Sequence, residues 1–244
     1  MAFPVLEENE IVPSVVAGHS LGEYSALVCA GAMSFADAVR TVRKRGQFMQ
    51  EAVPVGEGAM AAIIGLDTDK IKEICAETAN MTNQCVQAVN FNCPGQIVIA
   101  GATEAVHKAC DRLKEAGAKR AILLPVSAPF HSTLMQPAAD RLKEVLDSVE
   151  IVDAKIPVVA NVNAKPETKA DEIRSQLVLQ AASPVLWEDS VRRMMNDGVD
   201  TFVEVGPGKV LCGFIKKVDR SYAPLNVEDM ESLEKSLAYL KEVR

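Results

Sequence analysis

The segment from Gly18 to Gly22, which reads Gly-His-Ser-Leu-Gly, constrains this chain more than any other. It follows an extended run at residues 12–17 and leads into a helix-prone segment, so Ser20 is expected at a sharp strand-to-helix turn. The two glycines let the backbone turn tightly, and the first amides of the following helix point toward any oxyanion formed beside the serine. This pattern favours a nucleophile elbow. The alternative is a structural turn whose serine caps a helix.

Composition limits the classes of protein to consider. The chain has 244 residues, 48% of them hydrophobic, which suffices for one large domain or for a domain that carries an insertion. A net charge of -7 argues against nucleic acid as a partner, because neutralising phosphates requires a basic face. The six cysteines and three histidines are scattered, so no metal site is expected. Without a basic leader or an apolar run of membrane-spanning length, we expect a cytoplasmic protein with reduced thiols and no membrane partner.

The middle of the chain has a pattern of its own, in the order β-α-β-β-α-β. Strands are expected at residues 58–65, 85–91, 96–100 and 120–126, and helices at residues 69–79 and 103–116. This order fits a ferredoxin-like unit at residues 55–126, inserted into a larger α/β domain formed by residues 1–54 and 127–244. Stretches rich in proline and glycine mark the two junctions. Beyond them, expected helices at 133–149 and 185–196 and expected strands at 156–162 and 201–205 resume the α/β alternation.

His131 is the candidate base for Ser20. It lies in a proline-containing loop, expected at a surface or cleft, just ahead of an amphipathic helix. The N-terminus of that helix disfavours the imidazolium, so the ring stays neutral and can accept a proton. From this segment alone, the alternative to a catalytic base is a structural histidine that packs in a loop or caps its helix. His19 adjoins the nucleophile and its side chain is therefore directed elsewhere, whereas His107 lies in a charged helix.

Arg45 is the third candidate. A helix is expected from Ser34, with a spacing to Asp37 that resembles a capping box. Arg45 falls within the apolar stripe of that helix, which consists of Ala38, Val42, Met49 and Ala52. An inward guanidinium needs an anionic partner. Three uses remain open at this point: a buried pair with Asp or Glu, a side chain that snorkels to the edge, and a bidentate clamp for a substrate carboxylate.

Taken together, these segments closely resemble one family. The motif at residues 18–27, the Arg45-Gly46 pair, the segments 89–96 and 129–131 and the stretch 204–208 are similar, in order, to malonyl-CoA:acyl-carrier-protein transacylases of bacterial fatty-acid synthesis. The resemblance runs nearly from end to end. It implies an α/β-hydrolase-like large subdomain with a ferredoxin-like insertion, in agreement with the division of the chain above.

The resemblance implies a reaction and roles for residues. Ser20 would take a malonyl group from malonyl-CoA with His131 as base, and the phosphopantetheine thiol of acyl carrier protein would then accept it, with no cofactor. Arg45 would clamp the malonyl carboxylate, and Phe130 would exclude a branched methylmalonyl group. The Gln180 backbone carbonyl would steady His131.

The oxyanion hole and the docking face are also expected from the resemblance. The Leu21 backbone amide is the recognisable oxyanion donor. Asn90 and Asn161 are expected to bind substrate, and either of them, or Gln96, is a candidate second donor. The implied carrier protein is acidic, so docking needs a local basic patch, for which the candidates are Arg192, Arg193, Lys209, Lys216, Lys217 and Arg220.

One feature of the family has no counterpart in this sequence. Family members carry an upstream Gly-Gln-Gly loop whose glutamine contributes to the oxyanion hole, and only 19 residues precede Ser20 here. The segment is therefore expected to be missing and transfer to be impaired. Two alternative functions follow: a serine thioesterase that admits water as acceptor, and an acyl-binding protein that has lost catalysis.

Overall fold

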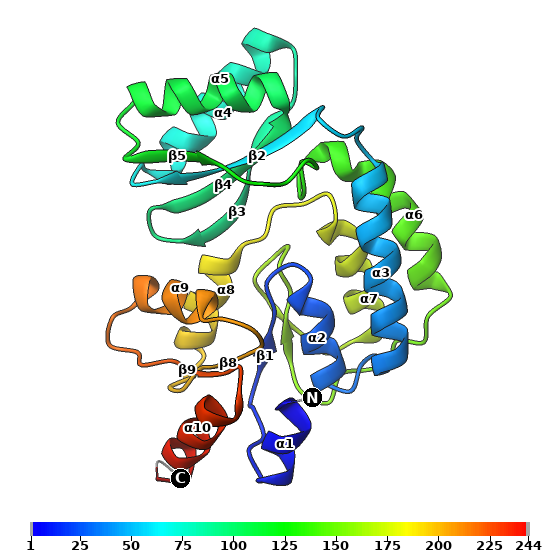
Figure 1. The fold of residues 1–244 in the computed structure, drawn as a ribbon. Helices are drawn as coiled ribbons and strands as arrows, with labels where there is room; N and C mark the ends of the chain where they lie inside the picture. The colour runs from blue at the N-terminus through cyan, green and yellow to red at the C-terminus, as the bar shows by residue number, and fades with distance from the viewer. Residues whose placement is uncertain (1, 243–244) are drawn as a thin grey trace.

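The computed structural model describes residues 2–242. A small sheet covered by two helices lies on a larger group of helices that surround short strands (Figure 1). Along the chain the elements are α1 (Ala2–Glu8), β1 (Val16–Ala17), α2 (Gly22–Cys29), α3 (Phe35–Glu51), β2 (Gly58–Ile64), α4 (Thr68–Thr82), β3 (Val86–Cys93), β4 (Gln96–Ala102), α5 (Thr103–Glu115), β5 (Arg120–Leu123), the 3-10 turn η1 (Thr133–Met135), α6 (Gln136–Asp147), β6 (Val158–Val159), β7 (Pro166–Glu167), α7 (Ala170–Gln180), α8 (Trp187–Asn196), β8 (Val203–Val205), α9 (Val210–Val218), β9 (Leu225–Val227) and α10 (Met230–Glu242).

The small sheet has the strand order β3-β4-β2-β5 and is antiparallel throughout. Helices α4 and α5 cover one face, and Ile63, Ile71, Ile99 and Leu113 are fully buried between helices and strands. This is the ferredoxin-like unit that the sequence predicts. The last strand is shorter than expected: β5 ends at Leu123, because Pro125 has no amide hydrogen to donate to a ladder.

The chain enters and leaves the small unit at one point. A Cβ placed on Gly58, the first residue of β2, would lie 2.3 Å from Cδ of Pro129, so only glycine allows the entering and leaving segments of the chain to touch here. We propose on this basis that the chain divides at residues 54/55 and 126/127, as the sequence analysis expects.

The larger part contains two short sheets. Strand β1 pairs with β6 in parallel, β6 pairs with β7 antiparallel, and β8 pairs with β9 in parallel. One apolar cluster packs α2, α3, α6 and α7 around β1, and a second packs α8 and α9 against its other side. The expected strand at 156–162 is only two residues long in β6, and α6 begins at Gln136, three residues later than the expected helix, with Pro137 in its first turn.

These elements bring the candidate residues together. Strand β1 runs directly into the Ser20 turn, and α3 lies beside α2 and α6 (Figure 1). Among the described residues, no helix has the length and the apolar character needed to cross a bilayer.

Candidate active site

Ser20 occupies a strained turn between β1 and α2, with φ of +52°. A left-handed backbone at a non-glycine residue costs about 1–3 kcal/mol and is typical of functional sites. The two motif glycines serve different needs. A Cβ on Gly18 would lie 1.9 Å from the Gly22 carbonyl carbon, which closes the turn, whereas a Cβ on Gly22 would meet nothing within 4 Å. The second glycine therefore leaves open space beside the serine.

Two buried side chains hold the Ser20 backbone in place. Asn161 Oδ1 accepts a hydrogen bond from the Ser20 amide at 2.6 Å, and Asn161 Nδ2 donates to the Gly18 carbonyl at 2.8 Å. Gln180 Nε2 donates to the Ser20 carbonyl at 2.9 Å. Both polar atoms of the Asn161 side chain thus bind the elbow, and contact of this residue with substrate or an oxyanion stays a prediction.

His131 lies against the serine hydroxyl. Its Nε2 is 2.7 Å from Ser20 Oγ, and its Nδ1 is 2.9 Å from the Gln180 carbonyl oxygen. Because a carbonyl only accepts, Nδ1 must carry the proton, which leaves the Nε2 lone pair to accept the serine proton. Of the two places expected for the loop around His131, a surface or a cleft, the exposed surface does not fit, because the residue is only 3% exposed. His131, like Ser20, has a left-handed backbone, with φ of +65°.

The pKa of His131 is lowered to about 3, chiefly by burial and then by the nearby Arg45 charge. The ring is neutral at pH 7, as expected, but the cause expected from the sequence, the N-terminus of a helix, is wrong, because burial is the largest cause. The other two histidines are elsewhere. His19 Nε2 lies 2.8 Å from Asn92 Oδ1 and its ring packs on Trp187, while His107 is exposed on α5.

We expect acylation of Ser20 to be independent of pH between about pH 5 and 8, because a base with a depressed pKa stays neutral throughout this range, whereas an ordinary histidine titrates near 6.5. The measurement is kcat/KM for acylation against pH, since this ratio reports the free enzyme. The same profile for His107→Gln is the control. A break near pH 6.5 in both proteins would contradict the assignment of a buried, neutral base.

The same depressed pKa predicts how stability changes with pH. Below its unfolded pKa near 6.5, the unfolded chain protonates His131 while the folded chain does not, so this group destabilises the fold as the pH falls toward 3. The contribution to stability is therefore complete above pH 6.5 and is lost in acid.

Arg45 reaches the same serine from α3. The helix begins after Ser34, whose hydroxyl oxygen accepts a hydrogen bond from the Asp37 amide, as the capping pattern predicts. Arg45 Nη2 donates to Ser20 Oγ at 3.0 Å and to Gln180 Oε1 at 3.1 Å. Its guanidinium lies 5.8 Å from the centre of the Tyr24 ring.

Arg45 has no anionic partner of its own. Its side chain is only 5% exposed, its Nε is buried without a hydrogen bond, and within residues 2–242 no carboxylate forms an ion pair with it. Burial is the main influence on its pKa, which is lowered. Of the three uses left open by the sequence, the structural ion pair and the snorkelling side chain do not fit this environment. A buried guanidinium beside a nucleophile is suited to an anion that arrives from outside.

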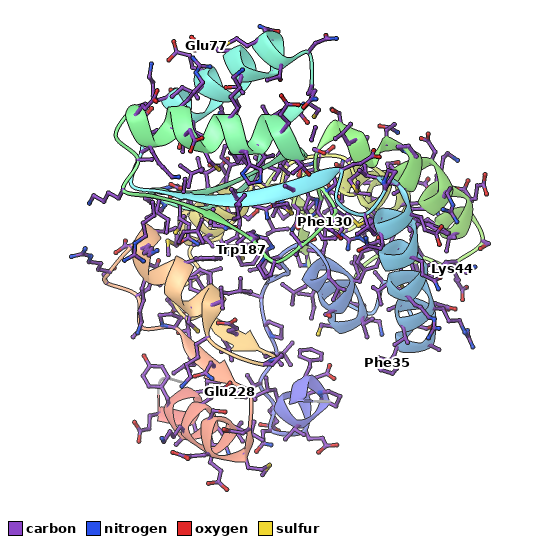
Figure 2. All side chains as sticks on the ribbon, turned by 45° about the horizontal axis from the view of Figure 1, so that its top comes forward. Phe35, Lys44, Glu77, Phe130, Trp187 and Glu228 are labelled. Carbon is purple, nitrogen blue, oxygen red and sulfur yellow. The ribbon has the colours of Figure 1, made fainter. Side chains whose placement is uncertain are left out.

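The remaining expected residues surround this centre. Phe130 is partly buried between the small sheet and the helices below it (Figure 2), in contact with apolar clusters on both sides. Asn90 lies on β3, and within residues 2–242 its buried Oδ1 has no hydrogen-bond partner. The Leu21 amide donates to no acceptor among the described residues and is available to an oxyanion. Gln96 accepts a hydrogen bond from Lys217 at the start of β4.

Sequence reasoning missed two contributors. It considered only the backbone of Gln180, whose side chain bridges Ser20 and Arg45, and it assigned no role to Glu23, which is buried on α2. Spacing gave a signal for Glu23, since it lies one helical turn after Ser20. Nothing local indicated the Gln180 side chain. Over residues 2–242, no group of three His, Cys, Asp or Glu side chains could hold a metal ion.

The expected docking residues are largely paired within the chain. Arg192 contacts Glu188, Arg193 contacts Asp197, and Lys209 contacts Glu228. A docking role for this set stays a prediction.

Comparison with known proteins identifies the family. The family model for the acyl transferase domain matches residues 8–236. The malonyl CoA-acyl carrier protein transacylase of Bacillus subtilis is 54% identical over 236 residues, which cover 97% of this chain and 74% of the relative. The chain belongs to the malonyl CoA-acyl carrier protein transacylase family.

Solved structures of this transacylase family have the same fold. The transacylase of Coxiella burnetii matches with a TM-score of 0.94 at 45% identity, over 97% of this chain and 75% of that one. A malonyl-transacylase solved in complex with a type II polyketide acyl carrier protein matches with a TM-score of 0.95 at 48% identity, over 98% and 77% of the two chains. The prediction of an α/β-hydrolase-like large subdomain with a ferredoxin-like small subdomain is confirmed by this likeness.

Proposed function

We propose that this chain transfers a malonyl group from malonyl-CoA to the phosphopantetheine thiol of an acyl carrier protein, through a malonyl ester on Ser20. The observation that carries the proposal is the buried Arg45, without a carboxylate partner, 3.0 Å from the serine hydroxyl that also contacts His131. This arrangement suits an acyl group that carries its own carboxylate. Support also comes from the malonyl transacylase relative in Bacillus subtilis and from the related complex with a carrier protein.

In the first half-reaction, Ser20 Oγ attacks the thioester carbonyl of malonyl-CoA while its proton moves to His131 Nε2. The carbonyl oxygen becomes an oxyanion, to which the Leu21 amide donates. Collapse of this intermediate breaks the carbon–sulfur bond, and His131 returns the proton to the sulfur, so coenzyme A leaves as the thiol. The malonyl ester remains on Ser20.

In the second half-reaction, the carrier thiol gives its proton to His131 and its sulfur attacks the ester carbonyl. Collapse now breaks the bond to Ser20 Oγ, which takes the proton back. The enzyme returns to its starting state, so the reaction is ping-pong and requires two substrates but no metal or cofactor. The Gln180 carbonyl keeps the His131 ring in the required tautomer through both halves.

Several further assignments belong to the same proposal. Phe130 walls the acyl pocket against a branched malonyl group, and Asn90 offers its free Oδ1 to the substrate. The carrier protein and malonyl-CoA are the partners, and the cytoplasm is the location, which fits the six free thiols of the described chain.

The acceptor distinguishes transfer from hydrolysis. We expect malonyl-enzyme, isolated free of malonyl-CoA, to lose its label rapidly when holo carrier protein is added and slowly in buffer alone. The measurement follows radioactive malonyl on both proteins. Carrier protein without its phosphopantetheine arm is the control and should not accept the label. Equal loss with and without holo carrier would indicate a thioesterase instead.

A further inference from the structure

Glu23 is a buried carboxylate directly beneath the nucleophile. It lies in the first turn of α2, is only 3% exposed, and forms no ion pair within residues 2–242. Its Oε2 accepts two hydrogen bonds, one from the Asn161 amide at 2.9 Å and one from Gln180 Nε2 at 3.0 Å. Burying a carboxyl group without a cationic partner is costly, so its presence at this position calls for a reason.

The two partners of Glu23 are the same two residues that hold the Ser20 backbone. Asn161 binds the Ser20 amide through its side chain, and Gln180 binds the Ser20 carbonyl. These residues come from distant parts of the chain, so neither fixes the position of the other through local backbone. Among the described residues, Glu23 Oε2 is the acceptor that both share, so it links their positions to each other and to the elbow.

Glu23 also decides which way the Gln180 carboxamide faces. Nε2 has two hydrogens, and its two acceptors are the Ser20 carbonyl and Glu23 Oε2. With Nε2 held there, Oε1 faces Arg45 Nη2. A carboxamide turned by 180° would direct its N–H groups at the guanidinium and its oxygen at two other oxygens. The Glu23 carboxylate therefore disfavours the orientation that leaves Arg45 without its acceptor.

We propose that Glu23 is a positioning residue for acyl transfer, which acts through Asn161 and Gln180 to fix the Ser20 elbow and the Arg45 clamp in register. The proposal rests on the proposed function for the clamp, but its claim about the elbow concerns Ser20 alone.

This role requires an acceptor oxygen at the end of a side chain as long as that of glutamate, and it does not require a charge. The pKa of Glu23 is raised to about 7, chiefly by burial; the hydrogen bonds from Asn161 and Gln180 oppose this rise, the Glu167 carboxylate on β7 adds to it, and the Arg45 charge on α3 opposes it. Both hydrogen bonds end on Oε2, so a proton on Oε1 leaves the acceptor intact. The elbow is therefore held in either protonation state. A glutamine at this position keeps one oxygen at the same reach, whereas an aspartate keeps the charge but is one methylene shorter.

The test compares Glu23→Gln with Glu23→Asp, and Glu23→Leu removes both charge and acceptor. Two rates are measured for each protein: the reaction of Ser20 with a fluorophosphonate probe, which needs no malonyl binding, and kcat/KM for malonyl-CoA and acetyl-CoA. We expect Glu23→Gln to stay within about fivefold of wild type in both, since it keeps both hydrogen bonds and loses only the charge assistance of each. Glu23→Asp and Glu23→Leu should fall by about 10²-fold, the size of effect that a misplacement of 1 Å produces, and should lose preference for malonyl.

Glu167→Gln is the matched control, because Glu167 is also buried, at 7% exposed, and its Oε1 accepts a hydrogen bond from Asn163 Nδ2 outside the site. It should leave both rates unchanged. Thermal melting identifies variants that fail to fold. If Glu23→Leu is one of them, the comparison of the rates of Glu23→Gln and Glu23→Asp still tests the positioning role. An active Glu23→Asp with an inactive Glu23→Gln would overturn positioning in favour of a counter-charge for Arg45. Variants that melt earlier but keep both rates would also overturn it.

The two rates separate this proposal from the proposed function. If the wild type reacts with fluorophosphonate but not with malonyl-CoA, the proposed function fails while the probe rates still test the role of Glu23 at the elbow. If the malonyl rate is normal but Glu23→Asp matches wild type, only the positioning role fails.

Discussion

Replacing Arg45 by methionine is expected to lower kcat/KM for malonyl-CoA by about 10² to 10³-fold and that for acetyl-CoA by less than about tenfold. The malonyl carboxylate loses its only buried cation, whereas acetyl has no carboxylate to lose. Methionine keeps most of the side-chain volume, so the packing against α2 and α6 is largely retained. The measurement is the ratio of the two kcat/KM values in wild type and variant. In the wild type, acetyl leaves the guanidinium unpaired, which is the physical source of selectivity.

Arg43→Met is the matched control for Arg45. Arg43 lies on the same helix two residues earlier but is exposed, so the same substitution there should change neither rate. Equal losses for malonyl and acetyl in Arg45→Met would show that Arg45 supports the fold or the serine instead of the substrate carboxylate.

Removing the base should have the second large effect. We expect His131→Ala to lower the rate of Ser20 acylation by about 10² to 10⁴-fold, because the serine hydroxyl then has no acceptor for its proton. Rapid-quench measurement of malonyl-enzyme formation gives this rate directly. His131 is buried, so circular dichroism and thermal melting must show that the variant is folded.

Two other histidines provide the comparison for His131. His107→Ala, on the exposed face of α5, should keep the wild-type rate of acylation. His19→Ala tests the neighbour of the nucleophile, whose ring contacts Asn92 and Trp187 instead of Ser20. If His19→Ala, and not His131→Ala, abolished acylation, the base would be misassigned.

Features with a local signal were predictable from the sequence. The glycines around Ser20 gave the turn, Ser34 gave the start of α3, and the 3.6-residue period placed Arg45 on the inward face. The β-α-β-β-α-β order followed from alternating apolar patterns. Each of these depends on residues close together in the chain.

Features set by contacts between distant segments were not predictable. The Gln180 side chain meets Ser20 from 160 residues away, and the Asn161 side chain meets it from 141 residues away. No pattern around either residue indicates a partner. The predicted reason for the neutral His131 ring was wrong on the same ground, because burial, which lowers its pKa most, depends on what the rest of the chain packs against the ring. The lack of an ion pair between Arg45 and any carboxylate of residues 2–242 also became visible only in three dimensions.

The location of the acyl group tests the central claim most directly. Wild-type protein is incubated briefly with malonyl-CoA, quenched in acid, and analysed by intact-protein and peptide mass spectrometry. The account predicts one malonyl group per chain, on the peptide that contains Ser20, and no adduct in Ser20→Ala. A malonyl group on Cys29 or Cys93, or an adduct that persists in Ser20→Ala, would contradict the account.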